Sequence, residues 1–421
     1  GLRAPPGPDP SFSGYLPVNT TLSGELFYWV FDSRDAPATD PLVIWLNGGP
    51  GCSSEMGLLF ENGPYTAEAA GTLRTNPFSW TEHANVLFVD QPVGTGFSFT
   101  KNIRDLTRNE DMVSKDFYAF LLKFFEAHPK YAGLPLYVAG ESYGGHYVPA
   151  ITYAIMKNNE SGKYPRMNLK GMAVGNGLVD PLTQYPAYPE FALQNAMIDR
   201  PMYDQLTQAM GKCKSLIELC AKKGPIGVAG CIAAVSMCQG SVVMPIVEAY
   251  SQKLGAQMNV YDIRGPCETP PLCYDTSGMQ KFLSDPEVKK QLGVEGHDWT
   301  ECSATVHTAL TADWMKNLEV HIPEMLHKGV QVLVYAGVED FICNWLGNEK
   351  WTHAMAWDGR EDFAKAEYQP IAGSDAIGEF KTASGLTFAK IKAAGHMVPY
   401  DQPEGALLMM DTLLLGRSTS Q

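Results

Sequence analysis

Six short apolar runs recur along the chain, and they constrain the fold more than any other feature. Each run ends in turn residues: PLVIWLNGG, ANVLFVDQP, LPLYVAGES, LKGMAVGNG, VQVLVYAGVED and TFAKIKAAGH. Apolar runs of this length are typical of strands buried on both faces of a parallel sheet. Helical patterns lie between them, the clearest in residues 111–128, where apolar side chains recur on one helix face. The alternation predicts an α/β fold with a mostly parallel sheet and helices on both faces.

This alternation breaks from about Asp180 to Asp313, where the sequence becomes helical or irregular. Six of the nine cysteines fall between Cys213 and Cys273. Because strand-like runs resume afterwards, we expect a helical, disulfide-linked insertion that caps the sheet. The predicted division is a core of residues 1–180 and 313–421, with the cap at 181–312.

The cysteine spacing is symmetric, since Cys213 and Cys220 are as far apart as Cys231 and Cys238. Nested bridges would produce this pattern, although other pairings remain possible. A zinc site is the alternative, but the stretch has no CxxC pair and no interleaved His, so we expect no metal. The expected disulfides, which leave Cys343 unpaired, are Cys213–Cys238, Cys220–Cys231, Cys267–Cys273 and Cys52–Cys302.

Charge and composition exclude several classes of partner. The net charge of −14 would repel the phosphate backbone of nucleic acids. The apolar stretch near the C-terminus is interrupted by Asp411 and is shorter than the roughly 18 residues that a membrane span requires, so we expect no span. Two glycosylation sequons, at Asn19 and Asn159, together with the expected disulfides favour the secretory pathway.

The segment Gly140-Glu141-Ser142-Tyr143-Gly144 follows one predicted strand and precedes a helical stretch. A GxSxG motif in this context is typical of a nucleophile elbow, in which glycines permit a sharp turn that exposes the serine beside helix amides. An ordinary glycine-rich turn is the alternative, because the motif also occurs by chance. The context favours Ser142 as a nucleophile.

A serine nucleophile needs a base and an acid, which in this fold follow in the order Ser, acid, His. Asp340 and His396 end two later predicted strands, so both should reach the same sheet edge as Ser142. His146 is the closest rival as the base, but on the helix it should point away from the hydroxyl. His83, His128 and His327 lie in polar contexts where a structural or solvated role is the better interpretation.

Longer motifs cover nearly the whole chain: WLNGGPGCSS at 45–54, DQPVGTGFS at 90–98, GESYGGHYVP at 140–149, GNGLVDPLTQY at 175–185, YAGVEDFICNWLGN at 335–348 and GHMVPYDQP at 395–403. In this order they resemble the serine carboxypeptidase family. The resemblance implies an α/β-hydrolase fold with a cap insertion, no cofactor, and release of single residues from peptide C-termini at acidic pH. It further implies peptide or protein substrates with a free C-terminus, a monomer or homodimer, and a vacuolar, lysosomal or secreted location.

The resemblance also assigns roles to individual residues. It implies Ser142, Asp340 and His396 as the catalytic triad, the amides of Gly49 and Tyr143 as the oxyanion hole, and Asn47, Glu61 and Glu141 as the group that binds the substrate carboxylate. Two neighbouring buried carboxyls should share a proton, because burial and mutual repulsion raise one pKa. A protonated Glu141 could then donate to the substrate carboxylate, and peptide affinity should fall at high pH. A solvated Glu pair is the alternative.

The resemblance implies two apolar pockets, which favour hydrophobic substrates. Around the residue before the scissile bond it places Leu178, Tyr185, Tyr188, Trp314, Ile342 and Cys343. Around the leaving C-terminal residue it places Met56, Phe60, Tyr261, Tyr274 and Met397. Three other functions are possible on this scaffold: acyl transfer from sugar esters, a non-catalytic stabilising role beside other enzymes, and hydroxynitrile lysis. The presence of Asn47, Glu61 and Glu141 favours the peptidase.

Overall fold

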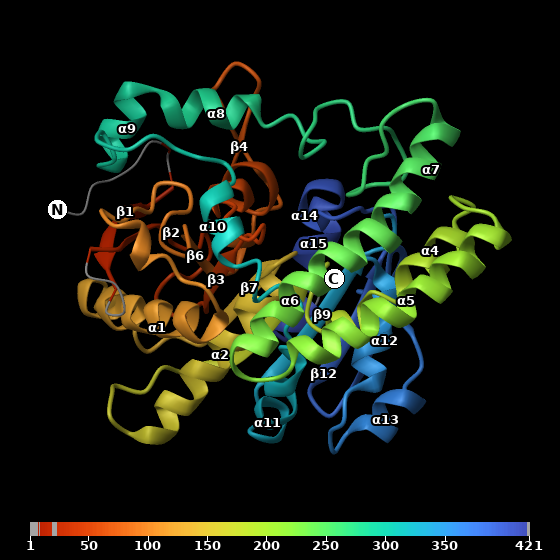
Figure 1. The fold of residues 1–421 in the computed structure, drawn as a ribbon. Helices are drawn as coiled ribbons and strands as arrows, with labels where there is room; N and C mark the ends of the chain where they lie inside the picture. Colours follow the sequence, from red (N-terminus) through yellow and green to blue (C-terminus); the bar gives the residue numbers. More distant parts are fainter. Residues whose placement is uncertain (1–6, 8, 19–22, 419–421) are drawn as a thin grey trace.

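A ten-stranded sheet forms the centre of the computed structural model, which describes residues 7, 9–18 and 23–418 (Figure 1). The strands lie in the order β1 (Ser11–Pro17), β2 (Glu25–Phe31), β6 (Asn85–Val89), β3 (Leu42–Leu46), β7 (Leu136–Glu141), β8 (Leu169–Gly175), β9 (Gln331–Gly337), β12 (Leu386–Ile391), β11 (Ser374–Ala383) and β10 (Gln369–Ile371). A separate hairpin pairs β4 (Tyr65–Ala67) with β5 (Leu73–Thr75).

The six strands from β6 to β12 in this order are mutually parallel, and they are the six apolar runs of the sequence. The remaining strands β1, β2, β10 and β11 are antiparallel additions at the two edges, which the sequence reading did not identify. Edge strands such as β11 are only partly buried and carry polar residues, so they lack a long apolar run.

Helices cover both faces of the sheet. Their bounds are α1 (Glu110–Ala127), α2 (Gly144–Ser161), α3 (Pro181–Gln184), α4 (Ala187–Gln194), α5 (Arg200–Cys220), α6 (Gly224–Cys238), α7 (Met244–Leu254), α8 (Ser277–Ser284), α9 (Pro286–Leu292), α10 (Ala304–Ala309), α11 (Ile322–His327), α12 (Trp345–Ala354), α13 (Arg360–Lys365), α14 (Val398–Asp401) and α15 (Pro403–Met409). Short 3₁₀ or π turns are η1 (Gly57–Glu61), η2 (Trp80–Glu82), η3 (Ile103–Asp105), η4 (Pro129–Tyr131), η5 (Gln239–Val243), η6 (Glu319–His321) and η7 (Met410–Leu414).

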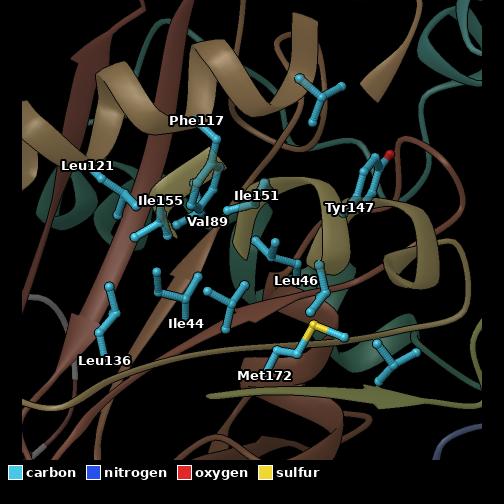
Figure 2. Packing of buried hydrophobic residues seen from close by; sticks show 14 of the residues in the cluster. Ile44, Leu46, Val89, Phe117, Leu121, Leu136, Tyr147, Ile151, Ile155 and Met172 are labelled. Atoms are coloured by element: carbon cyan, nitrogen blue, oxygen red, sulfur yellow. The ribbon is translucent and has the colours of Figure 1, made fainter. Parts of the chain in front are cut away.

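Alternate side chains of the central strands enter separate cores on the two sides of the sheet. Figure 2 shows one of them, where Ile44 of β3 lies near Phe117 of α1 and Ile155 of α2. The neighbouring Trp45 belongs to the core on the opposite side. Burial on both faces explains why these strands are continuously apolar, and it leaves their carboxyl ends as the place for polar chemistry.

The long connection from β8 to β9 contains helices α3 to α11. Helices α3 to α7 lie together on one side, whereas α8 and α9 lie near β4 (Figure 1). The limits 181 and 312 that the sequence suggested for a cap fall inside this connection and stay a prediction. The described cysteines form four disulfides, in the expected pairs Cys213–Cys238, Cys220–Cys231, Cys267–Cys273 and Cys52–Cys302, and Cys343 is a buried free thiol.

The segment Gly224–Leu254, which contains α6 and α7, is the one described helical segment long and apolar enough to cross a membrane by length and composition. At 31 residues it is longer than the C-terminal stretch on which the expectation of no span was based. Core helices of soluble proteins pass the same test. Two disulfides tie α6 to α5. One of the three hydrophobic core clusters of the described residues is built around this contact.

Of the two glycosylation sequons, only the one at Asn159 lies within the described residues. Asn19 lies outside the described residues. Asn159 lies on α2, where its side-chain amide donates to the carbonyl of Met167 at 2.8 Å and its side-chain oxygen accepts from the Met167 N–H at 2.9 Å. Glycosylation at either position stays a prediction.

Candidate active site

Ser142 lies on a sharp turn between β7 and α2, with a positive φ of 61°. A non-glycine residue in the left-handed region is uncommon and is found at strained functional turns. The sharp turn was expected, and the glycines of the motif were expected to permit it. Gly140 instead permits a close approach between two strands. A Cβ added to Gly140 would lie 2.5 Å from the carbonyl oxygen of Leu46, so glycine permits β7 to approach β3 closely, while the serine itself takes the strained conformation.

Asp340 and His396 form a buried pair in which Nδ1 of the imidazole lies 2.8 Å from Oδ2 of the carboxylate. The carboxylate also accepts from the side-chain amide of Asn176 at 2.9 Å and from the backbone N–H groups of Ile342 and Cys343 at 3.0 and 3.2 Å. Because a carboxylate only accepts, Nδ1 must carry the proton. When the imidazole is neutral, its Nε2 is therefore unprotonated, which is the form a general base requires.

The loop after β3 lies directly against the serine turn. A Cβ added to Gly48 would lie 2.3 Å from the backbone nitrogen of Tyr143 and 2.8 Å from Cβ of Ser142. The next residue of this loop, Gly49, lines the same cavity as Ser142. This contact is compatible with the predicted use of the Gly49 and Tyr143 amides to stabilise an oxyanion.

A buried carboxyl pair adjoins the serine. The side-chain amide of Asn47 donates to Glu61 and to Glu141, each at 3.0 Å, so one amide holds the two carboxyls next to each other. The oxygen of Asn47 accepts from the Trp45 indole at 2.8 Å and from the Gly57 N–H at 2.9 Å, which fixes the orientation of the amide. Burial raises the pKa of Glu141 well above its ordinary value, and the adjacent Glu61 raises it further; burial also raises the pKa of Glu61.

These groups meet in one cavity of about 390 Å³, which Asn47, Glu141, Ser142 and His396 line together. Four of the five residues predicted around the leaving residue also line it, namely Met56, Tyr261, Tyr274 and Met397. The fifth, Phe60, lies behind the wall: its ring centroid is 5.8 Å from that of Tyr274 and 4.4 Å from that of Tyr400.

The six residues predicted around the other pocket do not line this cavity. Leu178, Tyr185, Tyr188, Trp314, Ile342 and Cys343 pack instead with helices α4 to α6. Hydrogen bonds close this cluster, because the Trp314 indole donates to the Tyr185 hydroxyl at 3.1 Å and the Tyr188 hydroxyl donates to the carbonyl of Ile342. The cluster still reaches the site, since the Trp314 ring lies 5.4 Å from that of Tyr143 and 5.3 Å from that of His307.

Sequence reasoning missed one wall of the cavity. It is formed by residues from the irregular connection and from α10: Leu272, Ser303, Ala304, His307 and Thr308. The disulfide Cys52–Cys302 and the hydrogen bond from the Ser303 N–H to the Gly51 carbonyl, at 2.8 Å, hold this wall against the loop after β3. The predicted disulfide was the available signal, because it brings residues near 302 to the glycine-rich loop.

The four other histidines considered above contact groups outside the catalytic cavity. His146 is fully buried, its Nδ1 lies 2.6 Å from the Leu178 carbonyl, and burial lowers its pKa to about 4. His128 contacts the Tyr28 hydroxyl, whereas His83 and His327 lie beside Asp411 and Asp358, respectively. Within residues 7, 9–18 and 23–418, no group of three or more His, Cys, Asp or Glu side chains could hold a metal ion.

Comparisons with known proteins identify one family along nearly the whole chain. The family model described as serine carboxypeptidase matches residues 4–416. The chain is 43% identical over 407 residues to serine carboxypeptidase 3 of Oryza sativa subsp. japonica, covering 96% of this chain and 79% of that relative. It is 40% identical over 415 residues to carboxypeptidase Y homolog A of Leptosphaeria maculans, covering 96% of this chain and 73% of that relative.

A solved structure extends the likeness to the fold. KEX1(delta)p, a prohormone-processing carboxypeptidase from Saccharomyces cerevisiae, superimposes with a TM-score of 0.85 at 28% identity, covering 97% of this chain and 92% of that one. The expected α/β-hydrolase fold, with its mostly parallel sheet and disulfide-linked helical insertion, is confirmed. On the match of nearly its whole length, this chain belongs to the serine carboxypeptidase family of hydrolases.

Proposed function

We propose that the protein releases C-terminal residues from peptides, with a preference for apolar residues, and does so best at acidic pH. One observation carries the proposal: Glu141, one of two buried carboxyls that accept from Asn47, lines the same cavity as Ser142 and His396. An ordinary esterase has no need of a carboxyl pair beside its nucleophile. A peptidase that selects a free α-carboxylate needs donors at this point.

The reaction begins with attack of Ser142 Oγ on the scissile carbonyl while Nε2 of His396 accepts the hydroxyl proton. Asp340 holds the imidazole by Nδ1 and stabilises its charged form. The amides of Gly49 and Tyr143 stabilise the oxyanion. His396 then returns the proton to the leaving amine, and water hydrolyses the acyl-enzyme by the same steps in reverse order.

The carboxyl pair supplies the specificity for the end of the chain. At acidic pH at least one proton remains on Glu61 and Glu141, because burial and mutual repulsion raise their pKa values. A protonated Glu141 donates to the substrate carboxylate, and the Asn47 amide donates beside it. The apolar side chains of Met56, Tyr261 and Met397 line the same cavity and favour a hydrophobic leaving residue.

The first test compares an N-blocked peptide that has a free C-terminus with its C-terminal amide, at pH 4.5 and pH 7, by mass spectrometry. We expect stepwise shortening of the free acid, much weaker attack on the amide, and no release by Ser142→Ala. Equal attack on acid and amide would refute the role of the carboxyl pair. No release from either peptide would favour the acyltransferase or the non-catalytic alternative.

The four disulfides indicate folding in the secretory pathway. A vacuolar, lysosomal or secreted location agrees with the acidic optimum that we propose. Immunolocalisation of the protein in its native cells, with a cytosolic marker as reference, tests this. A cytosolic signal would contradict it.

A further inference from the structure

A second depression, of about 870 Å³, lies on the other side of α10 from the active-site cavity. Ala304 and Thr308 of α10 line both, so the two spaces share one short wall. The opposite sides of the depression are formed by η3 with the residues that follow it and by the first half of α6. We name this depression, lined by Ile103, Leu106, Arg108, Val228, Ala304 and Thr308 among others, the α10 groove.

The surface of the α10 groove is mainly apolar. Ile103 and Val228 project into it from its two sides and are 68% and 50% exposed, respectively. A single exposed apolar side chain is ordinary, but two that face one groove beside an active site indicate a binding surface. Arg108 is the charged residue of the lining, and no carboxylate contributes to it, although the chain carries a net charge of −14.

A substrate held by its C-terminal carboxylate at Asn47 and Glu141 must continue out of the cavity on its amino-terminal side. The α10 groove lies across α10 from that cavity, with Ala304 and Thr308 lining both, so a chain that leaves the cavity over α10 enters a groove with space for several side chains. A lipid surface fits less well, because the acidic molecule offers only Arg108 in this lining, whereas anionic membranes select clusters of basic residues.

From this adjacency and this chemistry, we infer that the α10 groove binds the segment of a peptide substrate upstream of the scissile bond and selects apolar side chains there. The inference rests on the proposed peptidase function and adds a second specificity site to it. Ile103 and Val228 are specificity residues that touch the upstream segment and take no part in the chemistry. Short substrates, which end before the groove, should be insensitive to both.

The test compares three substrates that share the same two C-terminal residues: an N-blocked dipeptide, a hexapeptide with upstream Leu residues, and a hexapeptide with upstream Lys residues. The variants are Val228→Asp, Ile103→Asp and Val228→Leu. The matched control is Val320→Asp, since Val320 is 61% exposed on η6, away from the lining of the groove. The exposure of these side chains makes misfolding an improbable cause of any change, and circular dichroism verifies the fold.

For the unaltered protein, kcat/KM should be higher for the Leu hexapeptide than for the Lys hexapeptide. Val228→Asp and Ile103→Asp should lower kcat/KM for the Leu hexapeptide on the order of tenfold, mainly through KM, and leave the dipeptide unchanged. Val228→Leu should retain the preference, and Val320→Asp should match the unaltered protein on all substrates.

Equal kinetics for Val228→Asp and Val320→Asp on the Leu hexapeptide would overturn the inference while leaving the peptidase function intact. An equal loss on dipeptide and hexapeptide would also overturn it, because the change would then act at the catalytic cavity. Altered sedimentation, or altered binding to phosphatidylserine vesicles, with unchanged peptide kinetics would assign the groove to a second copy or to a lipid surface. Failure of the unaltered protein to shorten any of the three substrates would refute the proposed function itself, and the inference with it.

Discussion

At the scale of single residues, the proposed chemistry depends on where two protons lie: one on Nδ1 of His396 and one on the carboxyl pair of Glu61 and Glu141. Asp340 accepts four hydrogen bonds, one of them from Nδ1 of His396, so the imidazole is held in one tautomer. Glu141 is the opposite case, because burial and the adjacent Glu61 raise its pKa and keep a proton near it. In the proposed reaction the two carboxyls therefore have opposite roles, set by the hydrogen bonds to Asp340 and by the burial of Glu141 beside Glu61.

Asp340→Asn should lower kcat on the order of 10⁴-fold with little change in KM, because an amide can donate to Nδ1 and so favours the wrong imidazole tautomer. The measurement is steady-state kinetics on the N-blocked dipeptide. A thermal unfolding curve like that of the unaltered protein serves as the control for folding. A loss of less than tenfold would contradict the assigned role.

Glu141→Gln should flatten the pH dependence of KM. In the unaltered protein, the protonated fraction of the pair falls about tenfold per pH unit above its effective pKa, so KM for a peptide acid should rise between pH 5 and 8. Gln donates a hydrogen bond at every pH, which removes this rise, whereas kcat should change less. An equally steep rise of KM in Glu141→Gln would show that another group titrates.

At the scale of elements, the serine turn depends on the close approach of β7 to β3. Gly140→Ala would place a methyl group 2.5 Å from the Leu46 carbonyl and should destabilise the fold by about 1–3 kcal/mol through overpacking. Gly133→Ala is the matched control, since nothing lies within 4 Å of its Cβ. Urea denaturation measures both variants. Equal free energies of unfolding would contradict the close-approach argument.

The sequence predicted these elements unevenly, for physical reasons. Strands such as β7 are buried on both faces, so a continuous apolar run in the sequence predicts them. Because these strands are parallel, the residues that follow them, Ser142, Asp340 and His396, were predicted at one edge of the sheet. Half-exposed strands such as β11 carry no such signal. The wall formed by Ser303, Ala304 and His307 comes from an irregular segment whose position is fixed by a disulfide and by backbone contacts, and no local pattern encodes such contacts.

At the scale of the whole molecule, three buried carboxyl pairs make stability depend on pH. Besides Glu61 and Glu141, Glu55 is buried near Asp90, and Glu110 near Asp313. Burial raises the pKa of Asp90 and of Asp313 to about 7, and it raises the pKa values of Glu55 and Glu110 well above the ordinary value. The folded chain therefore binds protons that the unfolded chain releases.

The free energy of unfolding should accordingly be highest at acidic pH and fall as the pH rises through about 7, because groups whose pKa is raised on folding stabilise only while protonated. Urea denaturation from pH 5 to 8 measures this. The double variant Glu110→Gln with Asp313→Asn should reduce the slope by up to about 1.4 kcal/mol per pH unit for each proton removed from the linkage. Glu361→Gln, at an exposed position, should leave the slope unchanged.

The Cys52–Cys302 disulfide, with a sequence separation of 250, has a topological consequence for the chain. It closes the backbone into a covalent ring that carries Ser142, and it leaves Asp340 and His396 on the free tail beyond the ring. A protease that cuts the ring once cannot release a fragment while the bond is intact. Nicked and intact molecules would share one mass on a non-reducing gel, apart from the added water, and would separate into two bands only when a reductant opens the ring.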